Sequence, residues 1–274
     1  MNNLKIVYIN LDERLDRRNM MEAKLKRHFD ESEFSRFSAH KGDDRPCSIK
    51  KAELGCFLSH QNVINNASDT AFTLILEDDI IFPAKFKNYL VPLLEVVSKF
   101  NPVEWDILFL TQMTNITNFA GTYNLLNLKR HLKKKGDGDD LQVIDCKNYY
   151  ASSCSAYLLN PKSKKKISEI LDAQLTEKYP FPIDLLWMRE IEQNRILCKF
   201  IFPYIIGLES LADSSIQSNH QFSSSTLLED QLNLFYVDMD LERLIEKYTS
   251  SDELISNNKE QFLASQILFR RLLY

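Results

Sequence analysis

The sequence has few of the features that mark secreted or nucleic-acid-binding proteins. Its cysteines number five in 274 residues and include no Cys-x-x-Cys pair, so their spacing indicates neither a zinc site nor a disulfide framework. A net charge of −4, from 34 basic and 38 acidic residues, lacks the positive excess typical of nucleic-acid binding. We therefore expect no nucleic-acid partner, and the odd set of cysteines favours a reducing, cytoplasmic location.

Long apolar runs and glycine-rich motifs are also missing. No run approaches the roughly 18 residues that a membrane-spanning helix requires. The chain enters an apolar strand at residues 4–11 without the basic segment and apolar core of a signal peptide, so none is predicted. The six glycines form neither a G-x-G-x-x-G nor a G-x-x-x-x-G-K-[ST] motif. The sequence thus favours neither dinucleotide-dependent hydride transfer nor P-loop nucleotide hydrolysis.

What is present is an alternation of apolar runs and segments of helical periodicity. The runs that predict strands are residues 4–11, 71–76, 105–110, 153–159 and 196–206. The segments with helical spacing are residues 16–29, 51–66, 86–100 and 161–175. This order predicts an α/β fold in which helices flank a mixed sheet, and no internal repeat divides it.

Two parts of the chain fall outside this alternation. Residues 114–140 combine Asn and Thr clusters, the basic stretch Lys129–Lys135 and a GDGDD segment, which predicts an excursion or a mobile flap. The C-terminal residues show helical spacing with few strand signals, over 227–248 and 252–273. We therefore predict a main domain over residues 1–215 and a helical extension over residues 216–274.

Three acids, Glu77, Asp78 and Asp79, directly follow a predicted buried strand. Because side chains alternate along a strand, Glu77 and Asp79 are expected to converge on one side. Hard cations such as Mn²⁺ and Mg²⁺ take carboxylate and phosphate oxygens, and strand ends are where open α/β sheets bind ligands. The triplet predicts a divalent-cation site, and the alternative is a solvated turn with a helix-capping role.

A second polar group follows the first strand. Arg17 and Arg18 lie in the first turn of the predicted helix, where the helix dipole disfavours cations. We interpret them as groups that help backbone N–H groups to hold a phosphate or a uracil carbonyl. The alternative is that they are solvated or paired with Asp12, Glu13 or Asp16.

Several segments occur in an order that resembles a known family. They are VYINLDERLDRR (7–18), FSAHKG (37–42), ELGCFLSH (53–60), LILEDDIIF (74–82), WDILFL (105–110), CSAYLLNPKSKKKI (154–167) and PIDLLW (182–187). Together they resemble glycosyltransferase family 25, which contains bacterial lipooligosaccharide galactosyltransferases and animal collagen galactosyltransferases. The resemblance implies a GT-A fold, a UDP-sugar donor, most often UDP-galactose, an inverting transfer, and Mn²⁺ (or Mg²⁺) at the acidic motif.

The resemblance also implies roles for individual residues. Glu77 and Asp79 match the outer acids of the family's D-x-D equivalent, with Asp79 as the first metal ligand and Glu77 in contact through water or the donor ribose. Ser59 and His60 close the family's G-C-x-L-S-H motif beside the same cleft. The implied donor-binding residues are Asn10, Leu11, Arg14, Arg17, Ala39, His40, Gly42, Ser59, His60, Glu77 and Asp78.

Three assignments carry alternatives. His60 is otherwise a buried histidine that holds a backbone carbonyl. Asp184, in PIDLLW, matches the acid of the family's P-x-D segment and is expected to be the acceptor-side base, the alternative being an N-cap for a following helix. Many relatives carry Ser-Asp-Ile where this chain reads LADSSIQSNH (211–220), which weakens any role for Asp213. It also weakens any role for His220, which is either a residue that completes the metal sphere or contacts the diphosphate, or a surface histidine.

The sequence thus predicts a metal-dependent, inverting hexosyltransferase that acts on a lipooligosaccharide or another glycan. A single base can deprotonate the acceptor while metal charge stabilises the departing UDP. Two alternatives stay open: a metal-dependent nucleotidyl or phosphoryl transferase, and a catalytically silent sugar-binding scaffold of the same fold. Residues 129–135 and 268–274 suit peripheral contact with an anionic membrane and a lipid-linked acceptor, or else an exposed loop and a packed helix. The helical tail equally suits a homodimer.

Overall fold

The computed structural model describes residues 3–43, 48–113, 124–125, 127–129, 131–132, 141–149, 153–177, 180–209 and 233–239. His220, most of the segment 114–140 and most of the predicted C-terminal extension lie outside these residues. No helix among the described residues combines the length and the apolar character needed to span a bilayer.

One part of the predicted extension is described. Residues 233–239 form turns and a β-bridge between Tyr204 and Tyr236, so the helical spacing does not produce a helix there. The backbone groups of Phe235 and Val237 bond to Tyr204 instead, and Phe235 is buried in the core. In residues 233–239, pairing with Tyr204, which follows β8, therefore overrides the local preference for a helix.

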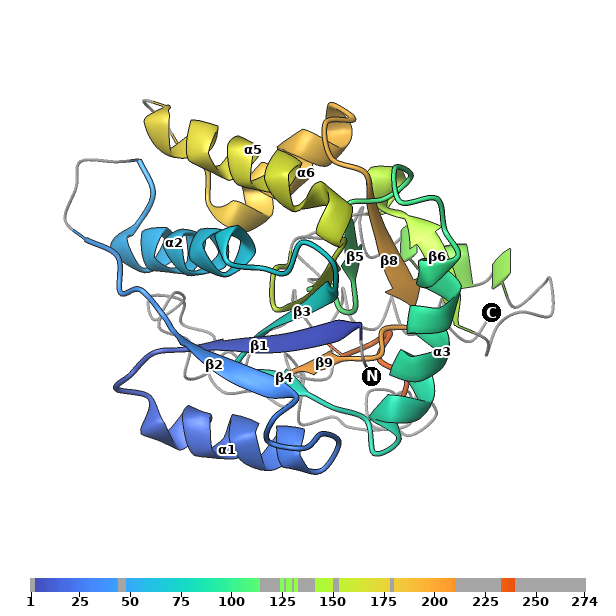
Figure 1. Ribbon diagram of the computed structural model, residues 1–274. Helices are drawn as coiled ribbons and strands as arrows, with labels where there is room; N and C mark the ends of the chain where they lie inside the picture. The colour runs from blue at the N-terminus through green and yellow to red at the C-terminus, as the bar shows by residue number, and fades with distance from the viewer. Residues whose placement is uncertain are drawn as a thin grey trace, which may run out of the picture.

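The centre of the fold is a mixed sheet of seven strands, in the order β2-β1-β3-β7-β5-β8-β6 (Figure 1). The strands are β1 (Leu4–Asn10), β2 (Phe34–Ser38), β3 (Phe72–Glu77), β5 (Ile107–Phe109), β6 (Gln142–Asp145), β7 (Ala156–Leu159) and β8 (Cys198–Phe202). β1 pairs in parallel with β2 and β3, and β5 with β8, whereas β7 is antiparallel to both its neighbours and β6 to β8. The predicted mixed sheet is confirmed and agrees with the GT-A-like architecture that the resemblance implies.

Helices cover both faces of this sheet. They are α1 (Leu15–Lys26), α2 (Lys51–Asn65), α3 (Phe86–Ser98), α5 (Lys164–Thr176) and α6 (Ile183–Glu192), with short 3-10 turns at Cys146–Asn148 and Pro161–Ser163. In Figure 1, α2, α5 and α6 lie above the sheet and α1 lies below it. β3 shows the reason, because Ile75 belongs to the apolar cluster of α2, α5 and α6, while Leu74 and Leu76 belong to that of α1 and α3.

Two strands of this seven-stranded sheet were not predicted from the sequence, β2 and β6, and they form its two edges. Their sequences, FSRFS and QVID, mix polar and apolar residues, and most of their side chains are partly exposed. A half-covered edge needs no continuous apolar run, so neither strand gives a strong signal.

The chain turns sharply where β3 ends. After Glu77 the backbone passes through Asp78 and Asp79 into β4 (Ile80–Ile81), which pairs with β9 (Gly207–Leu208). The N–H of Glu77 donates to the Ser155 carbonyl at 2.7 Å, and the Asp79 carbonyl accepts from the N–H of Glu209 at 2.9 Å. Backbone hydrogen bonds therefore fix the acidic triplet at both ends.

Candidate active site

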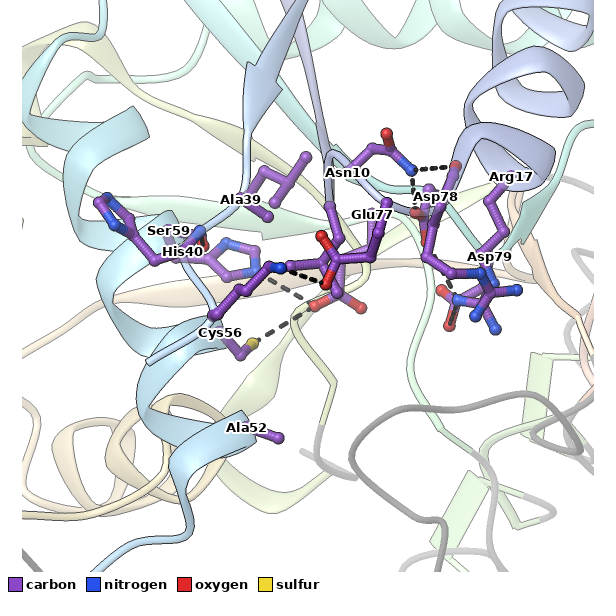
Figure 2. A pocket seen from close by; sticks show the side chains of 16 residues that line it. Asn10, Arg17, Ala39, His40, Ala52, Cys56, Ser59, Glu77, Asp78 and Asp79 are labelled. Carbon is purple, nitrogen blue, oxygen red and sulfur yellow. Dashed lines mark hydrogen bonds and ion pairs between the residues drawn. The ribbon is translucent and has the colours of Figure 1, made fainter. Parts of the chain in front are cut away.

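A cavity of about 270 Å³ opens at the carboxyl ends of β1, β2 and β3, the edge at which open α/β sheets bind ligands. Figure 2 shows Cys56 and His40 on one side of it and Arg17, Asp78 and Asp79 on the other. The lining residues are Ile9, Asn10, Leu11, Glu13, Arg14, Arg17, Ala39, His40, Lys41, Ala52, Cys56, Ser59, His60, Glu77, Asp78 and Asp79. Most of the residues implied by the resemblance thus meet in one place.

Asn10 and Arg17 hold the middle acid of the triplet. The Asn10 amide donates to Asp78 Oδ2 at 2.6 Å, and Arg17 Nη1 donates to Asp78 Oδ1 at 3.1 Å. Arg17 also lies 3.5 Å from Asp79 Oδ2. Both oxygens of Asp78 are therefore engaged, and α1 contributes one guanidinium that faces two carboxylates.

Asp79 is the acid with spare bonding capacity. Its Oδ1 is buried and has no hydrogen-bond partner among the described residues, while its side chain keeps 23% of its surface exposed. Burial, together with the charge of Glu77, raises the pKa of Asp79 to about 7. A buried oxygen without a partner is costly unless a ligand satisfies it. This position therefore fits a bound cation or a ligand hydroxyl that donates a hydrogen bond.

Glu77 has the opposite environment. Its Oε1 lies 3.2 Å from His60 Nε2, and its Oε2 accepts from the Ser155 hydroxyl at 2.8 Å. Burial disfavours its charge, but the hydrogen bond and positive charge of His60 prevail and lower the pKa of Glu77 to about 2. His60 is completely buried, yet Cys56 and Glu77 raise the pKa of its ring to about 9. Glu77 and His60 thus form an ion pair in the wall of the cavity.

The alternation of side chains along a strand does not explain why Glu77 and Asp79 have different polar partners. It predicts Glu77 and Asp79 on one side, and both do line the cavity. Their polar contacts nevertheless differ, because Glu77 turns toward α2 while Asp78 and Asp79 contact Arg17 on α1. β3 ends at Glu77, so the period of two does not extend to Asp79.

The loop after β2 forms the opposite wall. The N–H of His40 donates to the Ser59 hydroxyl at 2.8 Å, and the N–H of Ala39 donates to the Asn10 carbonyl at 3.0 Å. A Cβ on Gly55 would lie 2.4 Å from the His40 carbonyl, and Gly42 has a φ of +73°. Glycine at both positions lets this loop lie directly on α2.

Gly42 does not line the cavity itself but shapes its wall. The arginines at the start of the first helix also differ in whether they reach the cavity. Arg14, at the cavity, is paired with Asp16 through two hydrogen bonds of 2.8 and 3.0 Å. Arg18 pairs with Glu22 and is not a lining residue. Of the two arginines interpreted as phosphate-holding groups, Arg17 is the one that reaches the acids.

Asp184 lies in the first turn of α6 and is not among the residues that line the cavity. Its Oδ1 accepts from the Leu185 N–H at 2.9 Å. The N-cap residue of α6 is Pro182, so Asp184 favours the helix through its position near the positive end of the dipole rather than as the cap. Its proposed role as a base stays a prediction, as does any role of His220.

Sequence reasoning assigned no role to Cys56, Cys154, Ser155 or Tyr157. Cys56 lies inside the ELGCFLSH segment one helical turn before His60, which is a usable signal. The other three belong to the segment that enters β7, and Cys154 is 98 positions from Cys56. Only the pairing of β3 with β7 brings them to Glu77.

The sheet and its acidic cavity define an α/β protein with a pocket at the ends of its parallel strands, the edge at which open α/β sheets bind ligands. A sequence profile described as "Glycosyltransferase family 25 (LPS biosynthesis protein)" matches residues 3–187. The chain belongs to glycosyltransferase family 25, as its motifs indicated.

Similar proteins include procollagen galactosyltransferase 1 of Danio rerio, 38% identical over 64 residues, and procollagen galactosyltransferase 2 of Mus musculus, 34% identical over 64 residues. Each match covers 23% of this chain and 10% of the relative. A protein of Acanthamoeba polyphaga mimivirus, provisionally named a glycosyltransferase, is 37% identical over 116 residues, which cover 35% of each chain. The chain therefore spans only a small part of these relatives.

Among solved structures, the galactosyltransferase LgtC in complex with donor and acceptor sugar analogs gives a TM-score of 0.38 at 11% identity, over 72% of each chain. At this TM-score the likeness supports no conclusion about the activity of the present chain.

Proposed function

We propose that this protein transfers a hexose, with galactose the first candidate, from a UDP-sugar to a glycan acceptor with inversion at the anomeric carbon. The observation that carries the proposal is the buried Asp79 Oδ1, which has no partner within the described part of the chain, in a cavity that also contains Arg17 and Asn10. Membership of family 25 supports sugar transfer, and the names of the collagen-modifying relatives support galactose.

The cavity suits the donor in two parts. Leu11, Ala39 and Ile9 offer apolar surface for a uracil ring, while the polar side holds Arg17 and the acids. Arg17 is placed to share its guanidinium between Asp78, Asp79 and an incoming phosphate oxygen. Asn10 keeps Asp78 oriented, so that the carboxylates do not rearrange when the donor binds.

A divalent cation fits this site. Asp79 would hold it through its buried Oδ1, whereas Glu77 is committed to His60 and Ser155. When bound, Mn²⁺ or Mg²⁺ supplies positive charge that stabilises the departing diphosphate. With that charge supplied, the chain needs no acid on the leaving group and only one base on the acceptor side.

Asp184 is our candidate for that base. It lies on α6 outside the donor cavity, and its carboxylate already accepts a hydrogen bond from the backbone. The acceptor is proposed to be a lipooligosaccharide or a related glycan, in keeping with the family's description as LPS biosynthesis proteins. The deprotonated acceptor hydroxyl attacks the anomeric carbon from the face opposite UDP, and the C–O bond to the diphosphate breaks as the new one forms.

The decisive experiment needs no acceptor. The purified protein is incubated with a panel of UDP-sugars and Mn²⁺, and slow hydrolysis of the donor is measured. We expect release of UDP from one UDP-hexose, dependence on the metal, and loss in Asp79→Asn. Asp69→Asn is the matched control, because Asp69 is 82% exposed and pairs with Lys164 away from the cavity.

Thermal shift with UDP and Mn²⁺ separates the alternatives. Metal-dependent stabilisation by UDP without any turnover would favour a silent binding scaffold. Release of a nucleoside monophosphate rather than UDP would favour a nucleotidyl transferase. No stabilisation and no turnover with any donor would overturn the proposal.

A further inference from the structure

Four side chains, three of which line the cavity, meet around a single point. Cys56 and His60 lie one turn apart on α2, Glu77 ends β3, and Cys154 lies just before β7. One ligand atom of each, a sulfur, a ring nitrogen or a carboxylate oxygen, lies within 4.8 Å of all the others. We refer to these four residues as the thiol cluster.

Four of the distances within the thiol cluster match those expected in a tetrahedral zinc site. The two sulfurs are 3.9 Å apart, Glu77 Oε1 lies 3.6 and 3.4 Å from them, and it lies 3.2 Å from His60 Nε2. Ligands at ordinary zinc bond lengths in a tetrahedral site are separated by about 3.8 Å for S–S, about 3.5 Å for S–O and about 3.3 Å for N–O. All four measured distances agree with these values.

Neighbouring groups orient two of the ligands. The Tyr157 hydroxyl lies 2.9 Å from His60 Nδ1, which leaves Nε2 directed into the cluster. The Ser155 hydroxyl donates to Glu77 Oε2 at 2.8 Å, which leaves Oε1 directed inward. Fixing the second atom of a ligating histidine or carboxylate in this way is typical of metal sites in proteins.

We propose that Cys56, His60, Glu77 and Cys154 bind a structural Zn²⁺ ion. Two thiolates select a soft or borderline cation over Mn²⁺ or Mg²⁺, and four protein ligands leave no open position for substrate. On binding, the two thiol protons and the proton of His60 pass to solvent. The ion joins α2 to β3 and to the segment just before β7, and so fixes this wall of the cavity.

Two simpler explanations fit less well. A disulfide needs a sulfur–sulfur distance of about 2.05 Å, and the observed sulfurs are well beyond it. A Cys-His-Glu catalytic triad needs the two ring nitrogens of histidine to face the thiol and the carboxylate separately. In this protein His60 Nδ1 is taken by Tyr157, and Nε2 faces Glu77.

The site is independent of the donor cation proposed above, which depends on Asp79. The first experiment measures zinc in the full-length protein purified without chelators or affinity metals, and one ion per chain is expected. The second removes the metal and titrates Co²⁺, for which we expect the thiolate-to-cobalt charge-transfer band and the visible bands of tetrahedral cobalt.

Variants assign the ligands. Cys154→Ser and Cys56→Ser are expected to lose the charge-transfer intensity and to bind zinc at least tenfold more weakly. Cys146→Ser is the matched control, because Cys146 is a free, buried cysteine outside the cluster. Asp79→Asn is expected to keep the zinc while losing donor turnover, so the two proposals fail separately.

The proposal is overturned if the purified protein holds no zinc and the wild type gives no cobalt–thiolate band. Equal loss of the band in Cys146→Ser and Cys154→Ser would also overturn it. If either cluster variant does not fold by circular dichroism, the cobalt titration of the wild type still decides.

Discussion

Glu77 and Asp79 are two residues apart, line the same cavity and are both carboxylates, yet their polar partners differ. Glu77 is engaged by His60 and Ser155 and its pKa is lowered to about 2. Asp79 has a buried oxygen without a partner among the described residues, and its pKa is raised to about 7. One acid of the motif is already satisfied by the protein, and the other is left to be satisfied by a ligand.

The largest expected effect is at Asp79, the acid that is left for a ligand. Asp79→Asn keeps the shape of the side chain but removes the charge that a cation requires. We expect UDP-sugar turnover to fall by about 10²–10³-fold, as for the loss of one essential electrostatic contact in an active site. Asp69→Asn should retain full turnover in the same assay, and a loss under tenfold in Asp79→Asn would assign the cation elsewhere.

The next expected effect is on stability, at Glu77, the acid that the protein itself satisfies. In the metal-free protein, Glu77→Gln removes the negative partner of a completely buried His60 and leaves the positive charge without compensation. Breaking one half of a buried ion pair costs about 3 kcal/mol, so urea unfolding should shift by about that free energy. His60→Gln in the Glu77→Gln background should recover part of the loss, since no isolated charge then remains. Equal stability of Glu77→Gln and wild type would show that the pair contributes nothing.

A third prediction concerns the stability of Asp79→Asn, which is expected to increase although its turnover falls. The pKa of Asp79 is raised in the folded state from 3.8 to about 7, so its ionised form is disfavoured relative to the unfolded chain. This penalty is absent below pH 3.8, grows as the pH rises, and is complete above about pH 7. Without nucleotide or Mn²⁺, Asp79→Asn should therefore be more stable than wild type by up to about 4 kcal/mol at pH 8, with the difference shrinking toward pH 4. Paired thermal melts at several pH values measure it, and a gain that does not change with pH would contradict an origin in the buried charge of Asp79.

The sequence was sufficient for much of this picture, for identifiable reasons. β3 is a continuous apolar run because both its faces are covered, and the acids at its end stood out against that run. The ELGCFLSH and FSAHKG segments marked the wall of the cavity, where Gly55 and the loop around Gly42 touch. The local sequence pattern was enough wherever a feature depended on the residues of a single strand, helix or loop.

The sequence was insufficient wherever partners came from distant segments. Nothing local distinguishes Glu77 from Asp79, because their difference is made by Arg17 on α1, His60 on α2 and Ser155 before β7. The cysteine spacing argued against a zinc site for the same reason. Cys56 and Cys154 are 98 positions apart and meet only through the sheet.

The smallest expected effect sharpens the comparison at Arg17, the cation between Asp78 and Asp79. If Arg17 is placed for a phosphate, Arg17→Gln should weaken UDP binding by about fivefold, close to 1 kcal/mol. The same change removes the positive charge that lowers the pKa of Asp79, so that pKa should rise further and binding should need a higher pH. Titration calorimetry with UDP and Mn²⁺ at two pH values separates these contributions, with Arg18→Gln as the control because Arg18 pairs with Glu22 outside the cavity. Weaker binding in both variants to the same extent would mean that general positive charge, and not the position of Arg17 over the two acids, favours the donor.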